Sequence, residues 1–175
     1  MPKEPFKLNY LTVSLWVAIA GLLAFNFFYI FPLFDSVLIS YEENDGLQVA
    51  THLERLCPDC PSGSPPPAKD FADSINDFHL TRIAIYSATG VPRYVSGGEP
   101  LPGRGLPERL LATLRAGEKT ARIVVAPEGG GALSQVFVPV MEGGDLRGVF
   151  RIDRDITRHR RLLNKIKTVA TLTLT

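Results

Sequence analysis

Apolar side chains form an uninterrupted run near the N-terminus of the chain. Residues 11–34 read LTVSLWVAIAGLLAFNFFYIFPLF and include no charged side chain. A helix of about 20 residues crosses the hydrocarbon core of a bilayer. The run also lacks the polar face that a soluble helix shows at a period of about 3.6. We therefore predict a transmembrane helix over 11–34, after a cytoplasmic N-terminus over 1–10.

A cleaved signal peptide is the alternative interpretation of this run. Lys3 and Lys7 form a basic start, and Ala18-Ile19-Ala20 resembles a small-residue cleavage site. The apolar run continues for fourteen residues beyond that site, which favours an uncleaved anchor.

Flanking charges predict the orientation of the span. Lys3 and Lys7 precede it, whereas no Lys or Arg follows it until Arg55. Lys and Arg accumulate on the cytoplasmic side of membrane helices. We expect a single span within this chain, in the inner membrane of a bacterium, with the following domain in the periplasm.

Beyond the span, apolar spacing predicts an α+β domain. Helical periodicity covers 35–56 and 68–79, and the Pro-rich segment CPDCPSGSPPP over 57–67 interrupts it because Pro removes a backbone donor. Alternation predicts strands over 80–87, 91–95, 120–126, 132–141 and 145–153. A helix is expected between Pro107 and Gly117. The predicted order is helix, two strands, helix, three antiparallel strands, helix.

Two stretches resemble a known family. IAIYSATGVPRYVS and VFVPVMEGGDLRGVFRIDRDIT, together with the anchor, resemble periplasmic sensor domains of the PAS-like/Cache group. These occur in bacterial histidine kinases, diguanylate cyclases and chemoreceptors. The resemblance covers about 80–157 and implies a single Cache domain with a central antiparallel sheet and a C-terminal signalling helix.

The resemblance also implies a domain organisation. Extracytoplasmic helices with the Cys/Pro-rich loop are expected over 35–79, and the sensor sheet over 80–156. A helix over 157–175 is expected to lead to a second transmembrane span that is truncated in this chain.

The function implied is that of a sensory input module. It would detect a small ligand or the state of the envelope, and would pass a conformational change to a cytoplasmic output domain that this chain lacks. We expect a homodimer in contact with the lipid bilayer. The alternative is a single-span structural or interaction protein that binds a partner.

Five side chains on or near the predicted strands are candidates for binding a small anionic ligand. In sensor domains of this type such ligands bind the concave face of the sheet, and Arg suits a carboxylate. The alternative is that these alternating residues simply face water. The candidates are Arg82, Tyr86, Arg93, Tyr94 and Arg122.

Cys57 and Cys60 are the sharpest chemical signal. A haem-attachment motif requires His where Pro61 stands, and a structural zinc site requires about four ligands. A local disulfide is the simplest interpretation outside the cytoplasm. Redox or metal sensing, and free thiols, remain open.

The triplet Asp155-Ile156-Thr157 predicts a rigid junction between the last strand and the last helix. The Thr157 hydroxyl is expected to accept from an N–H of the first helical turn. Asp155 places negative charge at the positive end of the helix dipole, and Ile156 anchors the corner in the core. The junction is either a lever that carries a signal or only a cap.

Net charge and composition limit which partners and functions we expect. The formal net charge of +1 gives no indication of nucleic acid. No catalytic set or metal site emerges, and no cofactor is expected, so the sensor region is predicted not to be an enzyme.

A basic stretch begins the final helix and either approaches the second span or contacts lipid headgroups. It consists of Arg158, Arg160, Arg161, Lys165 and Lys167. In the predicted topology this basic stretch lies in the periplasm, although Lys and Arg accumulate on the cytoplasmic side of membrane helices. A cytoplasmic domain is therefore an alternative.

Overall fold

The computed structural model describes residues 10–96, 105–125 and 131–172. The chain divides into two compact units. The helical unit consists of Met1–Val37 and His159–Thr175, and the sheet unit consists of Leu38–Arg158.

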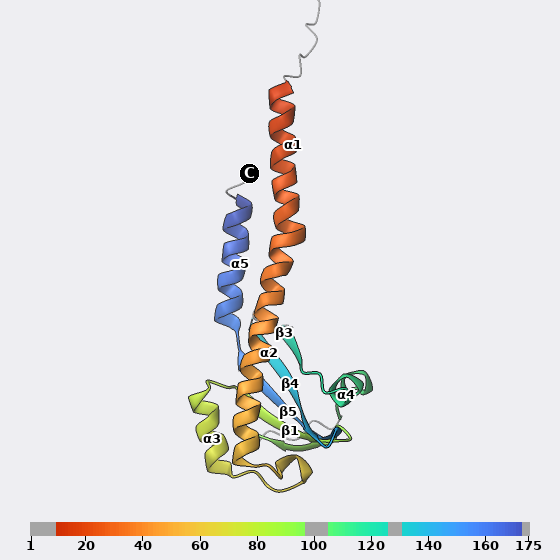
Figure 1. The fold of residues 1–175 in the computed structure, drawn as a ribbon. Coiled ribbons are helices and arrows are strands. Elements are labelled where there is room, and N and C mark those ends of the chain that lie inside the picture. The colour runs from red at the N-terminus through yellow and green to blue at the C-terminus, as the bar shows by residue number, and fades with distance from the viewer. Residues whose placement is uncertain (1–9, 97–104, 126–130, 173–175) are drawn as a thin grey trace, which may run out of the picture. The chain divides into compact units, whose positions relative to one another are not determined.

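The apolar run forms a continuous helix. Helix α1 spans Tyr10–Phe25, a π-helical turn spans Asn26–Ile30, and helix α2 spans Phe31–Leu56 (Figure 1). The most apolar window of this helix has a mean hydropathy of 2.1, and none of that window is buried. Among the described residues this is the one helix that is long and apolar enough to cross a membrane.

Five antiparallel strands make up the sheet, in the order β2-β1-β5-β4-β3. They span Arg82–Ser87 (β1), Pro92–Val95 (β2), Thr120–Val125 (β3), Ala132–Glu142 (β4) and Asp145–Asp155 (β5). Gly143 and Gly144 have φ values of 61° and 96°, which only Gly adopts readily. They form the tight turn of the β4–β5 hairpin, as the sequence predicts.

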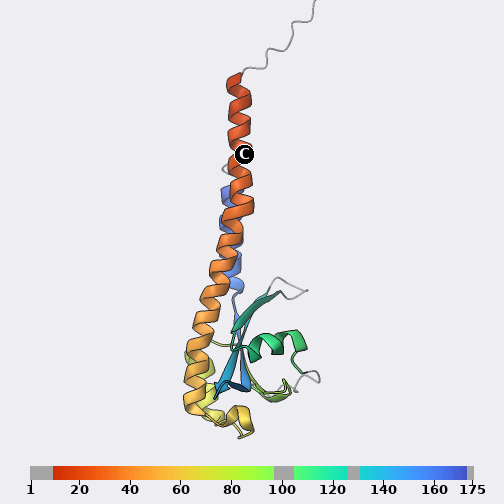
Figure 2. The same cartoon turned by 45° about the vertical axis from the view of Figure 1, so that its right-hand side comes forward.

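Helices cover both faces of the sheet (Figures 1 and 2). Helices α2 and α3 (Ala68–Asp77) lie over one face, where Leu53 and Phe71 pack on Ile83 and Phe150. Helix α4 (Glu108–Arg115) lies over the other, where Leu114 packs among residues that include Tyr86 and Phe137. Because side chains alternate along a strand, each strand contributes to both cores. We call these the α2 face and the α4 face.

Gly46 explains how closely α2 approaches the sheet. A Cβ atom at this position would lie 2.6 Å from Cγ1 of Val136 on β4. Glycine in the interior of a helix lowers the stability of the helix by about 1 kcal/mol relative to Ala. The close helix–sheet contact is what the missing side chain permits, so this residue has a packing role in the middle of the helix.

The predicted order of elements is confirmed, and the boundaries shift slightly. Helix α3 ends at Asp77, not at 79, because His79 adopts a left-handed backbone with a φ of 51°. Strand β5 continues to Asp155, two residues beyond the expected end, because Asp155 still pairs with Leu133 of β4. The final helix, α5, spans Thr157–Leu172.

Candidate functional site

A row of polar side chains crosses the α4 face. Arg82 on β1 is in register with Asp153 on β5, Asp153 with Gln135 on β4, and Gln135 with Arg122 on β3. Four strands therefore place one charged or amide side chain each along a line perpendicular to the chain direction. Arg151 precedes Asp153 by two residues and so shares its face.

A bidentate ion pair forms the centre of this row. The Nε and Nη2 atoms of Arg151 lie 2.7 Å and 2.6 Å from the two carboxylate oxygens of Asp153. The Asp153 side chain is only 2% exposed, and that of Arg151 is 15% exposed. The Nε atom of Arg82 lies 4.0 Å from the same carboxylate. Asp153 is thus held between two guanidinium groups.

The neighbours of the ion pair complete the polar surface. Arg151 also donates to the Tyr86 hydroxyl over 3.4 Å. Arg122 donates to the Gln135 side-chain oxygen over 2.8 Å, and its guanidinium lies 5.1 Å from the centre of the Phe137 ring. Three arginines therefore lie in this cluster, with Arg151 and Arg82 beside the Asp153 carboxylate and Arg122 on the Gln135 amide.

The environment of Arg151 keeps it charged. Burial lowers the pKa of its guanidinium, but hydrogen bonds and charge interactions with Asp153, and then with Tyr86, raise it, and the net pKa lies above the ordinary value. A permanently charged fork is suited to a carboxylate. Burial also raises the pKa of the Tyr94 hydroxyl.

The structure brings together three of the five candidate ligand residues. Arg82, Tyr86 and Arg122 lie on the α4 face. Tyr94 instead packs on the α2 face, with its ring centre 5.7 Å from that of Phe71. Arg93 is exposed on β2, an edge strand of the sheet.

Sequence reasoning missed three members of the row, Gln135, Arg151 and Asp153. A signal for the last two was available, because in the segment FRID the polar Arg and Asp alternate with buried Phe150 and Ile152. Polar residues at period two beside a buried face predict a second, polar face.

The junction after β5 is more firmly tied to the sheet than the sequence predicts. Ile156 is fully buried, as expected, and its N–H donates to the Ala132 carbonyl over 2.9 Å. The Thr157 hydroxyl accepts from the Ala132 N–H over 2.9 Å, so its expected role as the helix cap is wrong. Asp155 takes that role, since its carboxylate accepts from the Thr157 N–H over 2.8 Å. The hydroxyl of the first helical residue is directed back to β4.

Arg154, between Asp153 and Asp155, connects the sheet to the opposite layer. Its guanidinium forms an ion pair with Asp45 of α2, lies 3.8 Å from the buried Glu42, and donates to the Phe78 carbonyl over 3.3 Å. Three consecutive residues of β5 therefore contact the polar row, helix α2 and the start of α5.

Cys57 and Cys60 are joined by a disulfide at the end of α2. The short loop packs against β5, where a Cβ added to Gly148 would lie 2.5 Å from Cβ of Pro61. Arg147 donates to the Ser62 hydroxyl over 2.7 Å and pairs with Asp59 over 3.4 Å.

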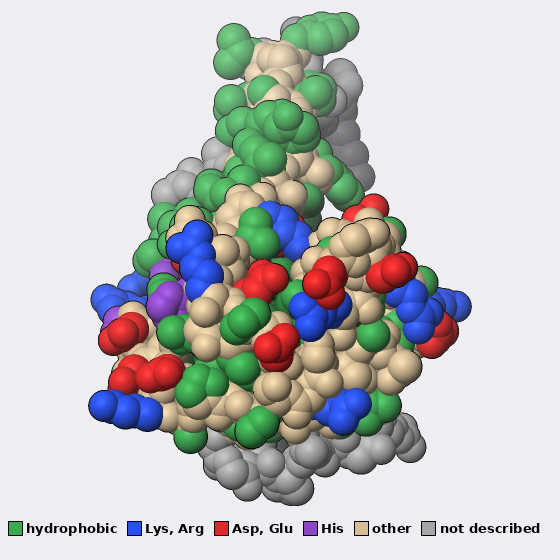
Figure 3. Space-filling model, turned by 60° about the horizontal axis from the view of Figure 1, so that its bottom comes forward, with side chains coloured by type: hydrophobic (Ala, Val, Ile, Leu, Met, Phe, Trp, Pro, Cys, Tyr) green, Lys and Arg blue, Asp and Glu red, His purple; other side chains and the backbone are tan. Residues whose placement is uncertain are grey.

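Charged side chains of both signs are interspersed on the surface turned toward the viewer in Figure 3.

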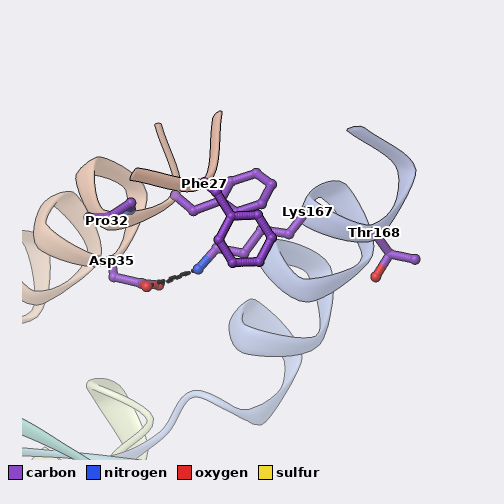
Figure 4. Close-up of a pocket in the computed structure, with 6 residues that line it drawn as sticks. Phe27, Pro32, Asp35, Lys167 and Thr168 are labelled. Carbon is purple, nitrogen blue, oxygen red and sulfur yellow. Dashed lines mark hydrogen bonds and ion pairs between the residues drawn. The ribbon is translucent and has the colours of Figure 1, made fainter. Parts of the chain in front are cut away.

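The helical unit contains a shallow groove of about 410 Å³ (Figure 4). Lys167 of α5 donates to the Asp35 carboxylate over 2.9 Å, and its ammonium lies 5.6 Å from the centre of the Phe31 ring. Phe27 and Pro32 also line the groove. Asp35 is the first charged residue after the apolar run, so Lys167 is paired at the end of that run.

Comparison with solved structures identifies the fold. The sensor domain of E. coli DcuS aligns with 71% of this chain over 96% of its own length, with 16% sequence identity and a TM-score of 0.51. The chain has the PAS-like/Cache sensor fold. This result confirms the fold that the sequence resemblance implies. No protein-family model and no curated protein matches the chain.

Two other structures with this likeness align less well. The ligand-binding domain of the Pseudomonas aeruginosa chemoreceptor PctC, solved with GABA, aligns with 74% of this chain and 61% of its own length, at 17% identity and a TM-score of 0.48. The ligand-binding domain of Mlp24, solved with asparagine, aligns with 84% of this chain and 58% of its own, at 15% identity and a TM-score of 0.35.

Proposed function

We propose that this chain is the extracytoplasmic sensory input module of a bacterial transmembrane signalling protein. The observation that carries the proposal is the row of Arg82, Asp153, Gln135 and Arg122 on the α4 face of a sensor-type sheet. The arginines of this face, two of them beside Asp153 and one on Gln135, present the kind of donor that suits an anion.

The ligand in this proposal is a small anion with at least one carboxylate or similarly shaped group. Guanidinium groups favour an anion, and a planar guanidinium fork binds two oxygens of one carboxylate. Phe137 and Tyr86 lie beside the charges but are almost fully buried, so the polar side chains are what this face offers to a ligand.

The proposed topology places the sheet unit in the periplasm, anchored in the inner membrane by 11–34. A periplasm-dependent reporter enzyme fused after Ser87 is expected to be active, because the basic N-terminus precedes the span and acidic residues follow it. The same fusion with a reporter that works only in the cytoplasm is expected to be silent. The reverse pair of results would overturn the orientation.

The proposed signal leaves through the junction after β5. Helix α5 would carry a movement of the strand toward an output domain. Exposed apolar residues recur on α5 at Leu162, Ile166 and Val169, a spacing that supports a homodimer in which helices of two copies pack together.

Anion binding by the full chain tests the proposal. The purified protein in lipid nanodiscs is titrated by calorimetry with acetate, malonate, tricarballylate and inorganic phosphate. At least one of these anions is expected to bind, and Arg82→Gln and Arg122→Gln are expected to weaken that binding by about tenfold or more. Arg55→Gln, an exposed substitution on α2, is the matched control and is expected to bind as the wild type does.

Two outcomes would contradict the proposal. If none of these anions binds to the wild-type protein, to the control or to Asp153→Asn, the α4 face is not an anion site. If an anion binds with equal affinity to all four proteins, binding occurs elsewhere. Either result would favour the alternative of a membrane-anchored interaction protein.

A further inference from the structure

The polar row already contains a carboxylate in the position where a ligand's carboxylate would be expected. Asp153 engages Arg151 through both oxygens, at 2.6 Å and 2.7 Å, in the fork-to-fork geometry that Arg uses for carboxylates generally. The pair is shielded from solvent, with side-chain exposures of 2% and 15%. The best anion-binding group on the α4 face is therefore occupied by the protein itself.

We propose that Asp153 is an internal competitor for the ligand, and that an anion binds by taking the place of the Asp153 carboxylate on Arg151. This inference rests on the proposed function and specifies how the site is regulated. It assigns Arg151 as the principal ligand-binding residue and Asp153 as the residue that sets the affinity threshold.

A displaced Asp153 has a second partner within reach. The Nε atom of Arg82 lies 4.0 Å from the same carboxylate, so a second guanidinium group already lies beside Asp153. A buried carboxylate without a partner would be costly. The exchange avoids this cost, because the carboxylate moves from one guanidinium to another while the ligand takes the first.

The exchange occurs close to the junction with α5. Asp153 lies two residues before Asp155, whose carboxylate accepts from the Thr157 N–H at the start of the helix. The Asp153 carbonyl also accepts from the Thr81 N–H over 2.8 Å. A change in how Asp153 is held therefore acts on the last paired residues of β5, directly before the helix begins.

Competition by an internal carboxylate has a measurable consequence. The ligand must break a charge-assisted contact before it can bind, and this lowers its apparent affinity. Asp153→Asn keeps the shape of the side chain and removes its charge. This variant is expected to bind the carboxylates malonate or acetate on the order of tenfold or more tighter than the wild type, the range of one hydrogen bond to a charged group.

The experiment is calorimetric titration of the full chain in nanodiscs with acetate, malonate and tricarballylate. Asp59→Asn is the matched control, because Asp59 also pairs with an arginine, Arg147 over 3.4 Å, but lies in the loop after α2. This control is expected to bind with wild-type affinity. Arg151→Gln, alone or combined with Asp153→Asn, is expected to lose most of the binding. Thermal unfolding of each variant reports whether the protein remains folded.

The outcomes separate this inference from the proposed function. Tighter binding by Asp153→Asn, and loss of that gain when Arg151→Gln is added, would support the exchange. Equal or weaker binding by a folded Asp153→Asn, with the wild type still binding through Arg82 and Arg122, would overturn the exchange and leave the sensor proposal standing. Absence of binding in the wild type and in Asp153→Asn alike would overturn both.

Discussion

The junction between β5 and α5 allows local capping to be separated from attachment to the sheet. Two substitutions remove one acceptor each. Asp155→Ala removes the carboxylate that accepts from the Thr157 N–H at 2.8 Å. Thr157→Val is nearly isosteric and removes the hydroxyl that accepts from the Ala132 N–H at 2.9 Å.

The two substitutions are expected to differ in where they act. Loss of a helix cap costs about 1 kcal/mol and affects mainly the first turn, with a further contribution from the charge near the helix dipole. Ala132 is only 1% exposed, so Thr157→Val leaves a buried N–H without its acceptor, at about 1–3 kcal/mol. The second cost falls on the sheet unit as a whole.

Hydrogen–deuterium exchange with thermal unfolding distinguishes these effects. Asp155→Ala is expected to accelerate exchange about fivefold in the first turn of α5, because 1 kcal/mol corresponds to roughly that factor, while the melting temperature of the sheet unit changes little. Thr157→Val is expected to lower that melting temperature and to expose the Ala132 amide. If Asp155→Ala destabilised the sheet more than Thr157→Val did, the assignment of the two roles would be wrong.

Three further predictions concern packing, thiols and the α2 layer. Gly46→Ala is expected to destabilise the sheet unit by about 1–2 kcal/mol in denaturant titrations, because overpacking against Val136 exceeds the gain in helix propensity, and Val136→Ala in the same chain should recover part of the loss. Protein kept from reductants is expected to show no free thiol at Cys57 or Cys60, whereas alkylation of both without reduction would contradict the disulfide. Arg154→Gln is expected to cost about 3 kcal/mol, since it leaves the buried Glu42 carboxylate without its cation, and an unchanged unfolding midpoint would refute this.

Periodicity predicts the fold well because the relevant signals are local. The apolar run over 11–34, the alternation over 132–141 and 145–153, and the glycine pair at the intervening turn each involve neighbouring residues. The helix after Pro107 is equally local, since Pro favours a helix start and Gly117 its end. Each of these elements is therefore in the structure at nearly the expected position.

Which residues form the polar row depends on how the strands pair and in what register. The local pattern of apolar and polar residues does not give this information. Arg82, Arg122 and Gln135 come from three separate strands and share a line only because β5 and β4 lie between β1 and β3. Alternation shows that Tyr94 and Arg93 face opposite ways, but not which of them faces α4. The Thr157 hydroxyl illustrates the same limit, because its donor, Ala132, is 25 residues away in the sequence.

The end of β5 suits the proposed function because alternation along one strand divides its contacts between both layers. Asp153 faces the polar row, whereas the next residue, Arg154, faces α2 and pairs with Asp45. Asp155 then caps the helix that follows. These three residues are consecutive in one paired strand, so their contacts with the polar row, α2 and the start of α5 are adjacent in the chain. If a ligand alters the partner of Asp153, as we propose, the contacts of Arg154 and Asp155 are the first that the change would reach.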